Sequence, residues 1–145
     1  MKIAIRKATR RDLNEISSLF LQESTKKPYN QKWNRKTAMD KIKEFFECCD
    51  IWLVEDTGSI VGFITLRISL WDKGKEATIN EFWLKPSYQG RGLGKKLLLF
   101  AEKESKKRGT KTFFLVSNKK SKAFGFYKKM GYNECKDLVL MEKSS

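Results

Sequence analysis

A glycine-rich hexapeptide constrains this chain more than any other feature. Its residues are Gln89, Gly90, Arg91, Gly92, Leu93 and Gly94. It lies between a strand-like run, residues 77–84, and a helix-like run, residues 93–105. Glycine allows backbone conformations that a Cβ forbids, and the amides that open a helix have no acceptor within it. Successive exposed amides form a nest for an anion, so the hexapeptide predicts a pyrophosphate cradle, with a ligand-free turn as the alternative.

Two better-known glycine motifs are excluded by spacing. A P-loop needs glycine five residues before its Gly-Lys pair and then Ser or Thr, but Gln89 and Lys96 occupy those positions. The dinucleotide fingerprint GxGxxG fails from either possible start, because Lys95 and Leu97 stand where its third glycine belongs. The cradle therefore belongs to neither of these nucleotide-binding classes.

The absence of histidine and the scarcity of cysteine narrow the chemistry that the chain can perform. Without histidine, Ser-His-Asp and Cys-His nucleophilic schemes are excluded, as is the commonest metal ligand. Three cysteines, two of them adjacent, are too few for a thiolate zinc site and do not form a disulfide framework. We therefore expect chemistry without a metal, in a reducing cytoplasm.

Chain length limits the number of domains, and the shortness of the apolar runs argues against a membrane-spanning segment. A chain of 145 residues can bury a core, and we expect one domain over residues 1–145. No apolar run is long enough to span a membrane, and the strand-like N-terminus lacks the apolar core of a signal peptide. We expect no membrane partner, and the sequence does not decide between a monomer and a homodimer.

Positive charge is concentrated after the glycine turn begins. The net charge is +14, and residues 91–145 hold 15 Lys and Arg against 5 Asp and Glu, a surplus of +10. This surplus lies where a polyphosphate ligand would bind and be steered. A solvated surface and a nucleic-acid face are alternatives, but the sequence contains no recognised DNA- or RNA-binding motif. Nucleic acid is therefore not favoured as a partner.

Hydrophobic spacing predicts strands and helices along the whole chain. Expected strands cover residues 3–5, 51–54, 60–68, 78–84, 112–116 and 138–141, and expected helices begin near residues 11, 35, 93 and 123. Thr9 is a candidate cap for the first helix. The run 112–116 is apolar throughout, as in a strand that is buried on both faces. The element order predicts a mixed α/β sheet.

Two motifs resemble those of the GNAT N-acetyltransferase superfamily. Gln-x-x-Gly-x-Gly in Gln89–Gly94 resembles its acetyl-CoA-binding signature, and residues 121–132 resemble its fourth-helix pattern, Ala-x-x-aromatic-Tyr-x-x-x-Gly-aromatic. The element order also matches over nearly the whole chain. The resemblance implies a central, mostly antiparallel mixed sheet of six to seven strands flanked by about four helices. It also implies an acyltransferase that binds acetyl-CoA at Gln89–Gly94 and moves the acetyl group to an amine.

The resemblance assigns a catalytic role to Tyr127. In the family the matching tyrosine commonly protonates the departing CoA thiolate, and a phenol with a pKa of about 10 is a suitable donor. The alternative is a core aromatic residue, because Phe126 and Met130 share its helical spacing. Family members often carry a cofactor-contacting Asn seven residues before this tyrosine. Lys120 occupies that position here, and Asn118 is the nearest candidate.

Glu81 is the candidate general base. On a regular strand Ile79, Glu81 and Trp83 point to one side, and large apolar neighbours would raise the pKa of the carboxyl group. The resemblance implies that an acidic residue here draws a proton from the acceptor amine, often through water. It also implies that the backbone around Phe82, Trp83 and Leu84 binds the pantetheine arm and polarises the acetyl carbonyl. A surface carboxylate paired with a lysine is the alternative.

The acceptor side is the least specified part of the sequence. Tyr29, Trp33 and Trp71 lie in or beside polar connections, where they either contact an amine through cation–π interactions or cover the core edge. Residues 51–90 hold 4 Lys and Arg against 5 Asp and Glu, which is mildly consistent with a cationic acceptor. Two other functions stay open: a basic nucleic-acid-binding protein, and an acyl-CoA-binding sensor without turnover.

Overall fold

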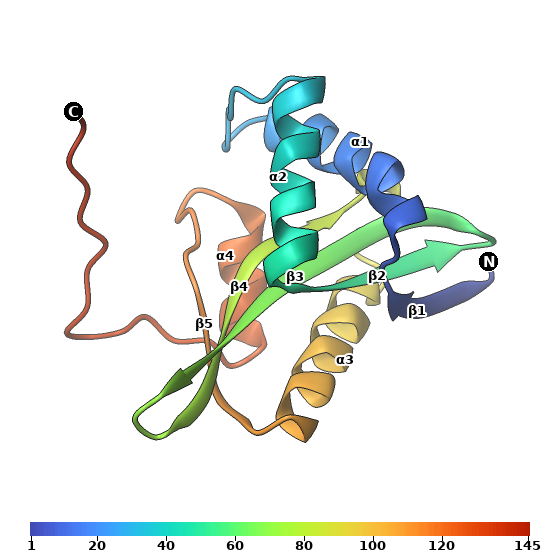
Figure 1. The fold of residues 1–145 in the computed structure, drawn as a ribbon. Coiled ribbons are helices and arrows are strands. Elements are labelled where there is room, and N and C mark those ends of the chain that lie inside the picture. Colours follow the sequence, from blue (N-terminus) through green and yellow to red (C-terminus); the bar gives the residue numbers. More distant parts are fainter.

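The computed structural model describes residues 1–145 and contains a five-stranded sheet with helices on both faces (Figure 1). The strands are β1 (Ile3–Lys7), β2 (Asp50–Asp56), β3 (Ser59–Trp71), β4 (Gly74–Leu84) and β5 (Thr110–Leu115). The helices are α1 (Leu13–Ser24), α2 (Arg35–Cys48), α3 (Leu93–Lys107) and α4 (Lys122–Lys129), with 3-10 turns at Arg10–Asp12 and Pro86–Tyr88. The strands follow the order β1-β2-β3-β4-β5, and only the β4–β5 pair is parallel. The predicted mixed, mostly antiparallel fold is confirmed.

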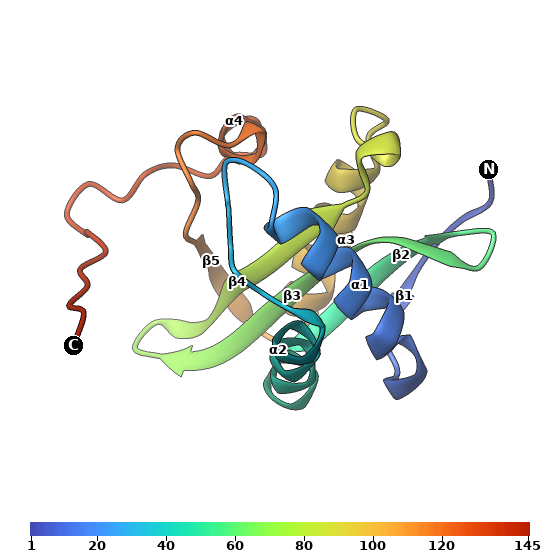
Figure 2. The ribbon, with the colours of Figure 1, turned by 90° about the horizontal axis from the view of Figure 1, so that it is seen from above.

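The sheet separates two hydrophobic cores. Helices α1 and α2 cover one face, and α3 covers the other (Figure 2). Strand β3 supplies both cores because successive residues of a strand point to opposite faces: Phe63 packs toward α1 and α2, and Ile64 packs toward α3. Both side chains are fully buried. None of the helices is long and apolar enough to cross a membrane.

An ion pair fixes the junction between β1 and α1. The guanidinium of Arg6 donates two hydrogen bonds to the carboxylate of Asp12, at 2.8 and 2.9 Å. The same carboxylate accepts from the backbone N–H of Thr9 at 2.7 Å. Thr9 is the N-cap of the 3-10 turn that leads into α1, whereas the N-cap of α1 itself is Asp12 rather than the predicted Thr9. The Arg6 guanidinium holds the pKa of Asp12 well below its usual range. The pair therefore ties β1 to the turn that begins α1.

We expect Asp12→Asn to lower the free energy of unfolding at pH 7 by about 2 kcal/mol, because hydrogen bonds to a charged group are lost. The native pKa of Asp12 lies below the unfolded value of about 3.9, so its contribution is complete above about pH 5. It is lost progressively as the pH falls through the unfolded value toward the native one, so the difference between the variant and the wild type should narrow below about pH 4. Urea unfolding between pH 3 and 7 measures this difference. The control is Asp40→Asn, which breaks an exposed pair with Lys36 and should change little.

The strand predicted at residues 112–116 is present as β5, but two other predictions at the C-terminal end are wrong: the burial of that strand on both faces, and the strand at residues 138–141. Strand β5 is an edge strand: Phe113 and Phe114 are only half-buried, and Val116 is 74% exposed, because only β4 pairs with it. Residues 138–141 form no strand, and the chain beyond Tyr132 runs away from the sheet (Figure 1). A strand obtains its backbone hydrogen bonds from a partner, and this segment makes none with β5. The sheet therefore has five strands rather than six to seven.

Candidate active site

The glycine turn follows the end of β4 and opens α3. Gly90 and Gly92 have φ angles of 75° and 78°, in the left-handed region where a Cβ costs about 1–2 kcal/mol. A Cβ at either position would meet nothing within 4 Å, so the backbone conformation and not space requires glycine. The side-chain amide of Gln89 donates to the carbonyl of Leu84 at 2.9 Å and ties the turn to β4.

Free backbone amides gather at the start of α3. The first hydrogen bond of the helix runs from the N–H of Lys96 to the carbonyl of Gly92, at 3.1 Å. The amides from Gly92 to Lys95 therefore have no acceptor in the helix. Free donors beside open space at the positive end of a helix dipole fit a phosphate group.

The other members of the hexapeptide have structural contacts. The side chain of Leu93 is buried and anchors the first turn of α3. Gly94 lies where a Cβ would be 3.7 Å from the ring of Phe126, so α3 and α4 pack closely here. The guanidinium of Arg91 lies 5.6 Å from the ring centre of Tyr88.

A bulge in β4 sets the direction of Glu81. The pairing of β4 with β3 skips one residue between Ile79 and Glu81, which leaves Asn80 without a partner. Ile79 therefore packs in the core under α3, whereas Trp83 packs against the core under α1 and α2. The prediction that Ile79 shares a side with Glu81 and Trp83 is wrong, because the extra residue reverses the alternation.

Glu81 is held in place by two hydrogen bonds. The indole N–H of Trp83 donates to its Oε1 at 2.7 Å, and its own backbone N–H donates to the hydroxyl of the buried Thr65 at 3.0 Å. Burial raises the pKa of Glu81, while the Trp83 hydrogen bond and the charge of Lys41 oppose the rise. The carboxyl group is thus oriented, and it is more basic than an exposed glutamate.

Strands β4 and β5 separate beyond the pair formed by Ile79 and Leu115. The backbone N–H of Lys85 donates to β3. The backbone N–H and C=O groups of successive strand residues point in opposite directions, so those of Leu84 point away from β3, into the gap that β5 leaves. The backbone of Phe82, two residues earlier, faces the same gap. The separation therefore leaves the N–H of Leu84 and the N–H and carbonyl of Phe82 without a strand partner, while the Leu84 carbonyl accepts from Gln89.

Tyr127 reaches this gap from α4. Its ring centre lies 6.2 Å from that of Phe82 and 5.7 Å from that of Tyr132. Burial raises the pKa of Tyr127, and Tyr29 and Glu81 raise it further. The phenol is therefore protonated at neutral pH and available as a proton donor.

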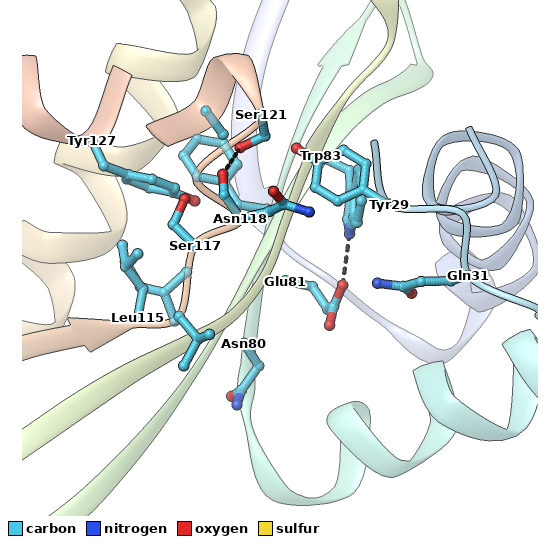
Figure 3. Close-up of a pocket in the computed structure, with 14 residues that line it drawn as sticks. Tyr29, Gln31, Asn80, Glu81, Trp83, Leu115, Ser117, Asn118, Ser121 and Tyr127 are labelled. Carbon is cyan, nitrogen blue, oxygen red and sulfur yellow. Dashed lines mark hydrogen bonds between the residues drawn. The ribbon is translucent and has the colours of Figure 1, made fainter. Parts of the chain in front are cut away.

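A cavity of about 230 Å³ joins these groups (Figure 3). Of the predicted site residues, it is lined by Tyr29, Glu81, Phe82, Trp83, Asn118 and Tyr127. Glu81 and Tyr127 come from the two sides of the β4–β5 gap (Figure 3). Asn118 holds its own loop together, since its Oδ1 accepts from the N–H of Lys120 at 2.8 Å and its carbonyl accepts from Ser121. The cavity thus combines a basic carboxylate with a protonated phenol.

Two predicted acceptor residues lie outside the cavity, and eight of the 14 residues that line it were not predicted. Trp33 packs on Phe20 with ring centres 5.2 Å apart, and Trp71 is exposed beside the turn that joins β3 to β4. Three of the unpredicted lining residues, Gln31, Asn80 and Ser117, are polar and lie outside both sequence motifs. No motif in the sequence distinguishes these polar residues from ordinary surface positions.

Comparison with known proteins decides the family. Residues 11–132 match the family model described as the acetyltransferase (GNAT) family. The chain belongs to the GNAT acetyltransferase family. This GNAT chain is 30% identical to an uncharacterized N-acetyltransferase of Methanocaldococcus jannaschii, over 90% of the chain but only 60% of that relative. It is 28% identical to a spermidine N(1)-acetyltransferase of Thermoplasma acidophilum, over 91% of the chain and 89% of the relative.

Solved structures of other proteins share the GNAT fold. A possible acetyltransferase from Clostridium difficile 630 superimposes with a TM-score of 0.86 at 16% identity, covering 100% of this chain and 99% of that one. An aminoglycoside N-acetyltransferase, AAC(6')-Iy, in complex with CoA gives 0.79 at 14% identity, covering 99% and 95%. The predicted family and fold class are confirmed, and the family is one of acyltransferases, the predicted enzyme class.

Proposed function

We propose that the protein is an N-acetyltransferase that moves an acetyl group from acetyl-CoA to a primary amine while both are bound. The observation that carries this proposal is the single cavity that holds Glu81 and Tyr127 beside the unpaired end of β4. The relative named spermidine N(1)-acetyltransferase supports an amine as acceptor.

The glycine turn and the β4–β5 gap would hold the donor. The free amides from Gly92 to Lys95 would bind the pyrophosphate, and the gap-facing backbone of Phe82 and Leu84 would bind the pantetheine arm. Asn118 would contact the cofactor from the other side of the gap. Acetyl-CoA supplies a thioester whose carbonyl carbon accepts the amine nitrogen.

Two side chains would move the protons. The Glu81 carboxylate would take a proton from the acceptor ammonium, directly or through a water, and so free the nitrogen lone pair. The new C–N bond forms, the C–S bond breaks, and the nitrogen releases its second proton to solvent water, which returns a proton to Tyr127 after the transfer. The Tyr127 hydroxyl would give its proton to the departing sulfur, so that the products are the acetylated amine and free CoA thiol.

Calorimetry with acetyl-CoA tests the donor half of this proposal. We expect Gly92→Ala to weaken binding at least about tenfold, because a Cβ strains the turn by about 1–2 kcal/mol and shifts the amides. The control is Gly125→Ala, in the middle of α4, where a Cβ meets nothing within 4 Å and should leave binding unchanged. No binding of acetyl-CoA to the wild type at high micromolar concentration would reject the proposal. Binding without thiol release across a broad amine panel would indicate a sensor.

A further inference from the structure

The cavity itself carries little negative charge. Glu81 is the only carboxylate among its lining residues, and the other polar lining groups are neutral, such as Gln31, Asn80 and Asn118. Lys41 is close enough to Glu81 to lower the pKa of that carboxyl group. One carboxylate can hold one ammonium group, and no second carboxylate lines the cavity for another.

Both loops that line the cavity are basic. Residues 25–34, which contribute Tyr29 and Gln31, contain three lysines and no acidic residue. Residues 116–122, which contribute Ser117 and Asn118, also contain three lysines and no acidic residue. Two of these six lysines are neutralised, Lys26 by Glu23 and Lys119 by Glu134.

The other four loop lysines are exposed and form no ion pair. They are Lys27, Lys32, Lys120 and Lys122, which we call the rim lysines. Two belong to each segment, Lys122 as the first residue of α4, so both segments that contribute to the lining of the cavity carry unpaired positive charge. A cavity of about 230 Å³ is smaller than the roughly 300–1,000 Å³ typical of ligand sites, so most of an acceptor would extend over these loops.

The structure assigns the acceptor to one chemical class: a primary amine on a carrier whose neighbouring groups are anionic, as carboxylates or phosphates. The assignment rests on the proposed function. Glu81 would hold the single ammonium group, and the rim lysines would attract the anionic groups on either side. A polyamine or an aminoglycoside would bring its remaining ammonium groups beside unpaired lysines, where like charges repel. The relative that is named for spermidine therefore differs from this chain in acceptor.

The rate of CoA thiol release, measured with a set of matched acceptors, tests the assignment. The probes are three short peptides that share one α-amine and continue with two Glu, two Gln or two Arg residues, together with spermidine and phosphoethanolamine. We expect kcat/KM to be at least about tenfold higher for the Glu peptide than for the Arg peptide, and the ratio to shrink at 0.5 M salt because salt screens exposed charges. A higher rate for phosphoethanolamine than for the Glu peptide would identify phosphate as the anionic group.

Reversing the charge of the two rim lysines in residues 25–34 gives a variant that tests the assignment. Lys27→Glu with Lys32→Glu should remove the preference for the Glu peptide and leave acetyl-CoA affinity intact. The control with the same change in net charge is Lys103→Glu with Lys106→Glu, on exposed positions of α3, and it should keep the preference. Equal rates for the three peptides, or faster turnover of spermidine, would overturn the assignment and leave the acetyltransferase proposal standing. Acetyl-CoA binding without thiol release from any acceptor would overturn both.

Discussion

Replacing Tyr127 by phenylalanine should lower kcat by about 10²–10⁴-fold, the range expected for loss of a positioned general acid. The raised pKa of Tyr127 keeps the phenol protonated at neutral pH, so the wild type holds its proton donor ready in every turnover. The variant keeps the ring, its packing on Phe82 and the shape of the cavity. Acetyl-CoA affinity should therefore stay unchanged while the rate falls.

Tyr132→Phe is the matched control for this experiment. Tyr132 is also a half-buried tyrosine beside Tyr127, but its hydroxyl donates to the carboxylate of Glu102 at 2.5 Å. Its loss should lower the free energy of unfolding by about 1–2 kcal/mol and leave the rate unchanged. Single-turnover measurements ensure that the chemical step is observed. If Tyr127→Phe keeps full single-turnover activity, Tyr127 is not the acid.

Replacing Glu81 by glutamine should lower kcat/KM by about 10²–10⁴-fold at neutral pH and change the shape of the pH–rate profile. The wild-type profile should rise with pH through the raised pKa of Glu81, because the carboxylate must be ionised to accept a proton. Glutamine has no such group but can still accept the hydrogen bond from Trp83, so the cavity stays ordered. The rise of the pH–rate profile that reports the ionisation of Glu81 should therefore disappear.

The loss in Glu81→Gln should also shrink at high pH. An acceptor amine with a pKa of about 10 releases its own proton more often as the pH rises, by about tenfold per unit below that value. The control is Glu76→Gln on the same strand, which changes charge equally at a carboxylate that does not line the cavity. An unchanged pH–rate profile in Glu81→Gln would remove Glu81 as the base.

Local sequence signals predicted the parts of the site that depend on local structure. The glycine turn has its own signature, since Gly90 and Gly92 adopt backbone conformations that other residues avoid. The start of α2 near Arg35 was predicted from helical spacing alone, and the structure shows that the neighbouring residue Asn34 caps it. Such features arise from contacts between residues close in the chain, which the sequence displays directly.

Features set by pairing between distant segments were not predictable in the same way. The bulge at Asn80 arises from the register of β4 against β3, and no residue type marks it. Trp33 and Trp71 were predicted on equal grounds, but one packs into a core and the other lies exposed beside a turn. The apolar run 138–141 has the composition of a strand, but composition does not provide a partner.

The C-terminal segment has a consequence for how the protein behaves at high concentration. The tail exposes four apolar residues, Leu138, Val139, Leu140 and Met141, and β5 has one edge without a partner strand. Each molecule therefore displays both a strand edge that can pair with another chain and an apolar segment that can pair with such an edge. Charged residues stand directly on both sides of the apolar run: Lys136 and Asp137 before it, and Glu142 and Lys143 after it. Flanking charges of this kind act as gatekeepers that oppose stacking between chains. They give the exposed tail its own protection against aggregation.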